Sequence, residues 1–195
     1  MTILVTAFDP FGGEETNASL EVLEALPVRI GSAELVKRVL PTVFGLSARL
    51  AAEAEEELRP EAVVCLGQAA GRTAVTPERV AINLMDASRP DNAGNLPADE
   101  PVVPGGPAAY FSTLPVKAMA AAVREAGIPA AVSTTAGTFV CNSLMYAMLH
   151  HAAERRPGLP CGFIHVPRPG EGLSREDLVR GVSAALGAVE KSIGG

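Results

Sequence analysis

Short apolar runs recur along the chain and alternate with stretches of helical periodicity. Such runs predict strands at residues 3–7, 62–66, 130–133 and 162–166, and residues 34–40 resemble a further strand region. Residues 79–84 alternate apolar and polar positions and predict another strand. We therefore expect a sheet whose strands are largely enclosed on both faces.

Between these runs, apolar residues recur at the three- and four-residue spacing of amphipathic helices. Helices are predicted from Asn17 to about residue 26 and over residues 43–58, 115–126, 143–156 and 174–193. Asn17 is a good helix cap, and residues 174–177 resemble a capping box. Strands that alternate with helices predict an α/β protein: a three-layer α/β/α sandwich with a mostly parallel, twisted central sheet, in a single domain over residues 1–195.

One segment fits neither pattern. Residues 86–107 are rich in Pro, Gly, Asp and Asn and predict an irregular loop. Irregular loops of about 20 residues are uncommon in compact domains and usually serve as functional covers or subunit contacts. The loop interrupts the predicted domain rather than dividing it, because neither flank is self-sufficient.

Composition and charge exclude several classes of function. Hydrophobic residues make up 48% of the chain and charged residues 19%, which suits a large core and leaves apolar surface for subunit contacts. The net charge is −6 and no run of Lys or Arg occurs, so nucleic acid and anionic membranes are not expected partners. The sequence has no basic leader and no apolar stretch of about 18 residues, so we expect a cytoplasmic protein.

Cys141 is the most informative single residue. It follows the predicted strand at residues 130–133 through a short connection and stands before a helix. Unpaired N–H groups and the dipole at a helix N-terminus favour the thiolate, which is the nucleophilic form of cysteine. Cys65 and Cys161 lie in or beside apolar strands and are predicted core residues. Three cysteines without CxxC spacing predict neither a disulfide framework nor a metal site.

A nucleophilic cysteine needs a base, and histidine is the usual one. His150 and His151 lie at the end of a predicted helix, where the dipole alone explains them. His165 closes a strand instead, and sites in α/β sheets form beyond the carboxyl ends of strands. Phe8 and Gln68 follow two other strands and are expected at the same crevice. These patterns do not single out a partner for the histidine.

Four segments together resemble the pyroglutamyl peptidase I family, the pyrrolidone-carboxylate peptidases. They are residues 6–13 with Asn17 and Ser19, residues 67–72 leading to 78–83, residues 136–142 with Tyr146, and residues 163–167. The segments occur in the family's order and span nearly the whole chain, so together they are very specific. The resemblance implies a single-domain cysteine peptidase with a triad of Glu78, Cys141 and His165 and no metal or cofactor.

The resemblance also implies the reaction and the pocket. Such an enzyme removes N-terminal pyroglutamate from peptides through an acyl-enzyme. Phe8 and Phe11 are expected to cover the faces of the lactam ring and Gln68 to read its edge, and the pocket is expected to include Val140 and Arg89. Family members usually read Asp-Ala-Arg-Ile-Pro-Asp-Asn where residues 86–92 read Asp-Ala-Ser-Arg-Pro-Asp-Asn. Arg89 thus stands one position later in the sequence than the arginine of the family pattern, which leaves its role in the pocket open.

Two other functions stay open at this point. A phosphate-dependent nucleoside phosphorylase has a similar α/β core, although the acidic residue in the Gly-rich loop at residues 8–13 would repel phosphate. A peptide-binding protein that kept the fold without catalysis is the second alternative, and the three filled triad positions argue against it. The resemblance further implies a homo-oligomer, a tetramer or a dimer.

Overall fold

The computed structural model describes residues 1–170 and 172–194, and its central layer is a six-stranded mixed sheet with the order β2-β3-β1-β4-β8-β5. The strands are β1 (Thr2–Phe8), β2 (Arg29–Ile30), β3 (Ala33–Leu40), β4 (Ala62–Gln68), β5 (Thr76–Pro77) and β8 (Cys161–Val166). The four inner strands are parallel, and the short edge strands β2 and β5 run antiparallel to their neighbours. The predicted mostly parallel sheet is therefore confirmed.

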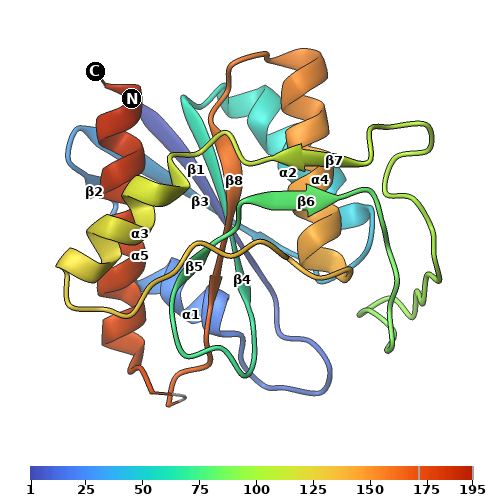
Figure 1. The fold of residues 1–195 in the computed structure, drawn as a ribbon, viewed down its shortest axis with the longest axis horizontal. Helices are drawn as coiled ribbons and strands as arrows, with labels where there is room; N and C mark the ends of the chain where they lie inside the picture. Colours follow the sequence, from blue (N-terminus) through green and yellow to red (C-terminus); the bar gives the residue numbers. More distant parts are fainter. Residues whose placement is uncertain (171, 195) are drawn as a thin grey trace.

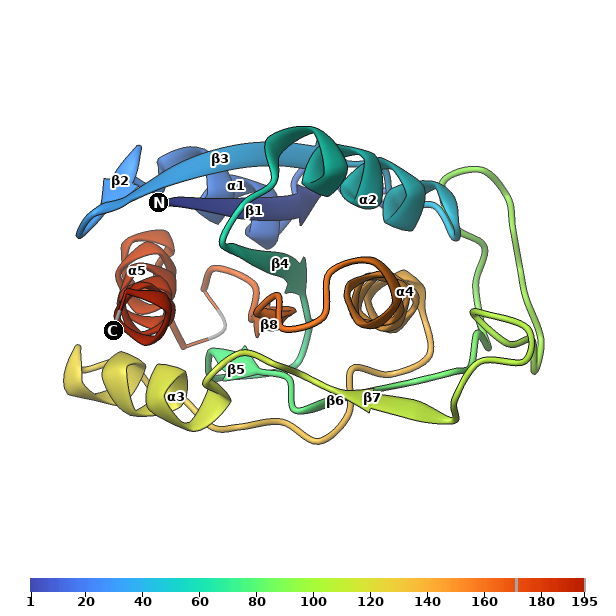
Figure 2. The ribbon, with the colours of Figure 1, turned by 90° about the horizontal axis from the view of Figure 1, so that it is seen from above.

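Helices cover both faces of this sheet, as Figure 2 shows. They are α1 (Ala18–Ala25), α2 (Leu46–Leu58), α3 (Val116–Glu125), α4 (Val140–Arg155) and α5 (Arg175–Ile193). Apolar side chains of α1, α3 and α5 form one core with the sheet, and those of α2 and α4 form the other. Asn17 caps α1, and Ser174 opens α5 with a capping box, as predicted. No helix in the described part of the chain is long and apolar enough to cross a membrane.

A second, two-stranded sheet lies outside the main sheet and packs on α4 (Figure 1). Its strands, β6 (Val80–Ile82) and β7 (Ala109–Phe111), are antiparallel. The inward side chain of Tyr110 contacts the rings of Tyr146 and His150 on α4. The predicted strand at residues 79–84 is therefore present but shorter, and the irregular loop at residues 86–107 connects its end to β7.

The prediction of a strand at residues 130–133 is wrong. The segment is extended but makes two isolated parallel bridges, from Ala130 to Val75 and from Ser133 to Glu78. Pro77 lies between the two bridged partners and has no N–H to continue the ladder. A second correction concerns α4, which begins at Val140 and not at residue 143, so that Cys141 lies inside its first turn.

Candidate active site

A cavity opens where the carboxyl ends of the inner strands meet. Its volume is about 450 Å³, within the usual range for small-molecule sites. The register pairs Gly67 at the end of β4 with His165 near the end of β8, and β1 ends beside them at Phe8. Six of the eight residues predicted for the site line this cavity: Phe8, Phe11, Gln68, Arg89, Cys141 and His165.

Cys141 is the second residue of α4 and lies partly open to the cavity. The N-cap residue, Phe139, provides no side-chain acceptor for the first-turn N–H groups. A helix start without such a cap is a ready site for a negatively charged group. On the strand side, the sulfur packs so closely against Gly67 that a Cβ at that position would lie 3.0 Å from Sγ.

The electrostatic setting of Cys141 differs from the one expected for an isolated helix start. Burial raises the pKa of the Cys141 thiol to about 12, and the negative charge of Glu78 adds to the effect. The positive charge of Arg72 and the hydrogen bond from the cysteine's own N–H lower the pKa, but by less. Desolvation outweighs the helix terminus, so the thiol is protonated at neutral pH in the unliganded protein.

His165 and Glu78 form a buried pair. His165 Nδ1 lies 2.7 Å from Glu78 Oε1, and the two residues are 3% and 0% exposed. Burial lowers the pKa of His165 despite the carboxylate beside it. Burial also acts to raise the pKa of Glu78, but the hydrogen bond and charge of His165 keep it below its ordinary value. At neutral pH a neutral imidazole thus donates Nδ1–H to a carboxylate, which leaves Nε2 as a base.

Arg72 completes this cluster and was not predicted to belong to it. Its Nη1 donates to Glu78 Oε1 over 2.6 Å, and its Nη2 donates to the Thr135 carbonyl over 3.0 Å. The side chain is 26% exposed and lines the cavity. The available signal was its place in the segment of residues 67–72, where it is the single charged residue.

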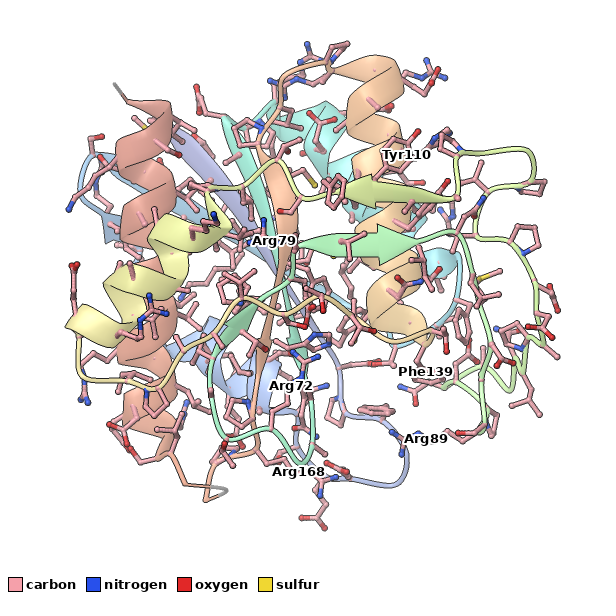
Figure 3. The ribbon with its side chains drawn as sticks, viewed as in Figure 1. Arg72, Arg79, Arg89, Tyr110, Phe139 and Arg168 are labelled. Atoms are coloured by element: carbon pink, nitrogen blue, oxygen red, sulfur yellow. The ribbon has the colours of Figure 1, made fainter. Side chains whose placement is uncertain are left out.

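Aromatic rings form the opposite wall of the cavity. Phe11 and Phe139 pack with centroids 5.9 Å apart, and Phe44 meets Phe139 edge-on at 5.2 Å. The Arg89 guanidinium lies over both cavity rings, 4.8 Å from the centroid of Phe11 and 5.8 Å from that of Phe139. Figure 3 labels Arg89 and Phe139 beside each other, with Arg72 across the cavity. Arg89 therefore reaches the cavity despite its displacement by one position.

Neighbouring residues explain how the loop tolerates that displacement. Asp91 accepts hydrogen bonds from the N–H groups of Phe44, Ala93 and Asn95, and Asn92 donates to Pro10 O over 2.9 Å. Asp86 N–H donates to Thr138 O over 3.1 Å, which ties the loop to the segment before α4. The loop is thus anchored on both sides of Arg89.

Three residues predicted for the pocket have other contacts. Gln68 Oε1 accepts from Ala18 N–H over 2.8 Å, and its Nε2 donates to Glu14. Val140 is fully buried in the core and does not line the cavity. Phe8 is 2% exposed and packs against Phe163 with centroids 6.4 Å apart, so little of its ring is open to the cavity. Phe11 and Phe139 are the more accessible rings.

Known proteins resemble this chain over nearly its whole length. The family model described as pyroglutamyl peptidase matches residues 1–189. A pyrrolidone-carboxylate peptidase of Levilactobacillus brevis is 52% identical over 97% of both chains, and one of Streptococcus pyogenes is 50% identical over 97% of this chain and 92% of its own.

Solved structures agree with the sequence comparison. The crystal structure of pyroglutamyl peptidase I from Bacillus amyloliquefaciens superposes with a TM-score of 0.95 at 42% identity and covers 97% of both chains. A mutant pyrrolidone carboxyl peptidase from the hyperthermophile Pyrococcus furiosus superposes with a TM-score of 0.94 at 39% identity, over 99% of this chain and all of its own. The family match includes the segments that contain Glu78, Cys141 and His165.

Proposed function

We propose, since this chain belongs to the pyroglutamyl peptidase family, that Cys141, His165 and Glu78 perform the hydrolysis by which it removes N-terminal pyroglutamate from peptides. The observation that carries the proposal is the buried Glu78–His165 pair at the same cavity as a cysteine in the first turn of a helix. The chain is a thiol peptidase, so neither of the other two functions left open by the sequence is needed.

The protonation states support a general-base mechanism. The Cys141 thiol is protonated at rest and His165 is neutral, so His165 Nε2 takes the thiol proton as the sulfur attacks the carbonyl that follows the lactam ring. The imidazolium then protonates the leaving amine, and the acyl group stays on sulfur. A water molecule, deprotonated by His165, releases pyroglutamate. Glu78 stabilises the imidazolium in both steps without taking its proton.

The start of α4 is suited to stabilise the tetrahedral intermediate. The N–H groups of its first turn are free of a side-chain cap and lie beside the sulfur. A single such donor to an oxyanion lowers the barrier by about 3 kcal/mol. We assign this role to the Cys141 N–H and its neighbours in the first turn.

The cavity wall fits a flat, uncharged lactam. Phe11 and Phe139 offer ring faces, and Phe8 also lines the cavity. A free amino terminus would be an ammonium in an aromatic pocket that already holds the Arg89 cation, and burying it without a partner is costly. Gln68 lines the pocket, but its side-chain amide is engaged with Ala18 and Glu14.

A homo-oligomer, either a dimer or a tetramer, belongs to the proposal as well. The outer face of the two-stranded β6–β7 sheet consists of Val80, Ile82, Ala109 and Phe111. Phe111 is 72% exposed. A second copy of the chain covering this apolar face would explain it. Light scattering on Phe111→Asp tests the idea, because the charge should lower the measured mass.

A nucleophilic thiol that must stay reduced fits a cytoplasmic protein.

The decisive experiment is hydrolysis of a fluorogenic pyroglutamyl amide by the wild type and by Cys141→Ala. We expect the variant to keep its circular dichroism spectrum and to lose turnover. Measurable turnover by folded Cys141→Ala would refute the assignment. Cys65→Ala is the matched control, since Cys65 is fully buried in β4 and should be dispensable for the chemistry.

A further inference from the structure

Arg72 connects three segments that meet at the cavity. It lies in the turn after β4, while Glu78 follows β5 and Thr135 belongs to the segment that leads into α4. One guanidinium nitrogen bonds to Glu78 and to the hydroxyl of Thr76, and another bonds to the Thr135 carbonyl. We propose that Arg72 is a positioning residue for the hydrolysis, holding Glu78 and the approach to Cys141 in one fixed arrangement. The inference rests on the proposed catalytic roles.

The bonding of Glu78 explains why such a residue is needed. His165 Nδ1 and Arg72 Nη1 both bond to the same oxygen, Oε1. The second oxygen, Oε2, has no hydrogen-bond partner of good geometry among the described residues. Without Arg72, Oε1 would keep only its bond to His165, and the carboxylate, which also interacts with the Ser133 side chain, would be less restricted about its terminal bond. The second bond from Arg72 selects one orientation and thereby fixes the imidazole.

The contact with Thr135 extends this control to the nucleophile. The carbonyl of Thr135 lies six residues before Cys141, in a segment whose ladder to Val75–Glu78 is interrupted at Pro77. The last backbone bond between the two segments runs from Arg79 N–H to Ser133 O, and the guanidinium adds a further bond beyond it. Glu78 and the segment before α4 are thus held by one rigid planar group, which a lysine ammonium would not reproduce.

The charge of Arg72 has a second effect, which separates positioning from simple structural support. It partly neutralises Glu78, so it lowers the pKa of His165, and it directly lowers the pKa of Cys141. Loss of the cation should raise both pKa values, because the imidazolium gains a more negative neighbour and the thiolate loses a positive one. The titratable and charged groups around these two residues are Glu78, Arg72 and Cys65, with Asp86 and Arg89 on the cavity wall.

A second cluster of the same composition provides a matched control. Glu55 on α2 is fully buried and is bonded by His151 Nε2 over 2.9 Å and by Arg156. Neither Glu55 nor its two partners line the cavity. Arg156→Gln therefore removes an arginine from a buried Glu–His pair at a comparable structural cost, without touching the proposed active site.

The experiment measures kcat and the pH profile of kcat/KM on a pyroglutamyl amide for Arg72→Gln, Arg72→Lys, Arg156→Gln and Cys141→Ala. We expect Arg72→Gln to lower kcat about 10- to 100-fold and to move the acid limb of the profile to higher pH. Arg72→Lys should keep the limb near its wild-type position, because it keeps the charge, and should still lower kcat. Arg156→Gln should be less stable with an unchanged profile.

Each outcome decides a separate point. An unmoved acid limb in folded Arg72→Gln, or an equal shift in Arg156→Gln, overturns the role of Arg72. If Arg72→Gln does not fold, Arg72→Lys decides. A wild-type kcat in Arg72→Lys overturns the role of Arg72, and a reduced kcat at an unchanged melting temperature, measured by circular dichroism, supports it. Turnover by Cys141→Ala would instead remove the proposed function itself, so the two failures are distinguishable.

Discussion

His165 Nδ1 lies 2.7 Å from Oε1 of Glu78, in a site where the carboxylate is fully buried. Because an ionised carboxylate only accepts hydrogen bonds, this contact fixes the proton on Nδ1 and leaves Nε2 as the base. In the proposed mechanism, the same contact stabilises the imidazolium that forms during the reaction. The pair therefore determines both the tautomer and the charge that the mechanism requires.

Glu78→Gln tests this relationship. The amide keeps the shape of the side chain but loses the charge, and it can present an NH₂ group that favours the wrong tautomer of His165. We expect kcat to fall about 10²- to 10⁴-fold, as for loss of the acid in other triads. Steady-state kinetics on a pyroglutamyl amide gives the measurement. Glu55→Gln is the control, since it alters an equally buried Glu–His pair outside the cavity; a similar fall in kcat there would contradict the prediction.

The sequence singled out the proposed nucleophile and base more directly than their partners. Cys141 and His165 could be selected because each follows a recognisable element, a strand end or a helix start. Glu78 follows β5, which has two residues and no periodicity, so it was reached through the family resemblance alone. Arg72 was missed because it is tied to the site by an ion pair with Glu78 and by a hydrogen bond to the Thr135 carbonyl, 63 residues away. Such contacts leave no pattern in a single sequence.

The same reasoning explains the errors in the fold. The inner strands were predicted to within two residues at each end. β1, β4 and β8 are runs buried on both faces, whereas β3 contains charged residues and is only partly buried. β2, β5 and β7 have two or three residues and were not predicted. The segment at residues 130–133 has strand-like composition, but its ladder depends on the neighbouring Pro77, which a local pattern cannot reveal.

Gly67→Ala should disable the enzyme by displacing the sulfur. A Cβ at Gly67 would lie 3.0 Å from Cys141 Sγ and 2.7 Å from the ring of Phe163. Both distances are too short, so the cysteine or the ring must move. We expect kcat to fall at least tenfold and the free energy of unfolding to fall by about 1–3 kcal/mol.

Gly187→Ala on α5 is the control. Its Cβ would meet nothing closer than 3.8 Å, and the alanine should stabilise the helix by about 0.5–1 kcal/mol. Wild-type kcat in Gly67→Ala would show that the sulfur has room to adjust.

Arg89→Ala should weaken substrate binding more than it slows the chemistry. The guanidinium lies over Phe11 and Phe139 at the cavity. Among the described residues, Arg89 forms no hydrogen bond or ion pair with Glu78 or His165. Loss of one such cation–π contact is worth about 0.5–1 kcal/mol, which corresponds to a rise in KM of about 2- to 5-fold. Arg49→Ala, an exposed arginine on α2, should leave KM unchanged. A fall in kcat with constant KM would assign Arg89 to the chemical step instead.

Acid should destabilise the fold partly through Glu55. Burial acts to raise the pKa of this carboxyl, but hydrogen bonds from Arg156 and His151, with their charges, keep it below its ordinary value. A carboxyl with a lowered pKa stabilises the folded state above its unfolded pKa of about 4.3, and this contribution is lost as the pH falls through the folded pKa. Glu55→Gln should lose about 2–4 kcal/mol at pH 7 and show a shallower decline below pH 5. Urea unfolding at pH 7, 5 and 4 measures this, and parallel curves for the two proteins would contradict it.

Alkylation of Cys141 should report the resting protonation state. With its pKa raised to about 12, the thiolate fraction rises tenfold per pH unit through the neutral range, and the rate of inactivation by iodoacetamide should rise with it. A thiolate–imidazolium pair would instead react at a nearly constant rate between pH 6 and 9. Mass spectrometry of Cys141→Ala provides the control, because Cys65 and Cys161 are buried and should stay unmodified. A pyroglutamate analogue should slow the reaction by occupying the cavity, and equal rates with and without it would argue that the ring binds elsewhere.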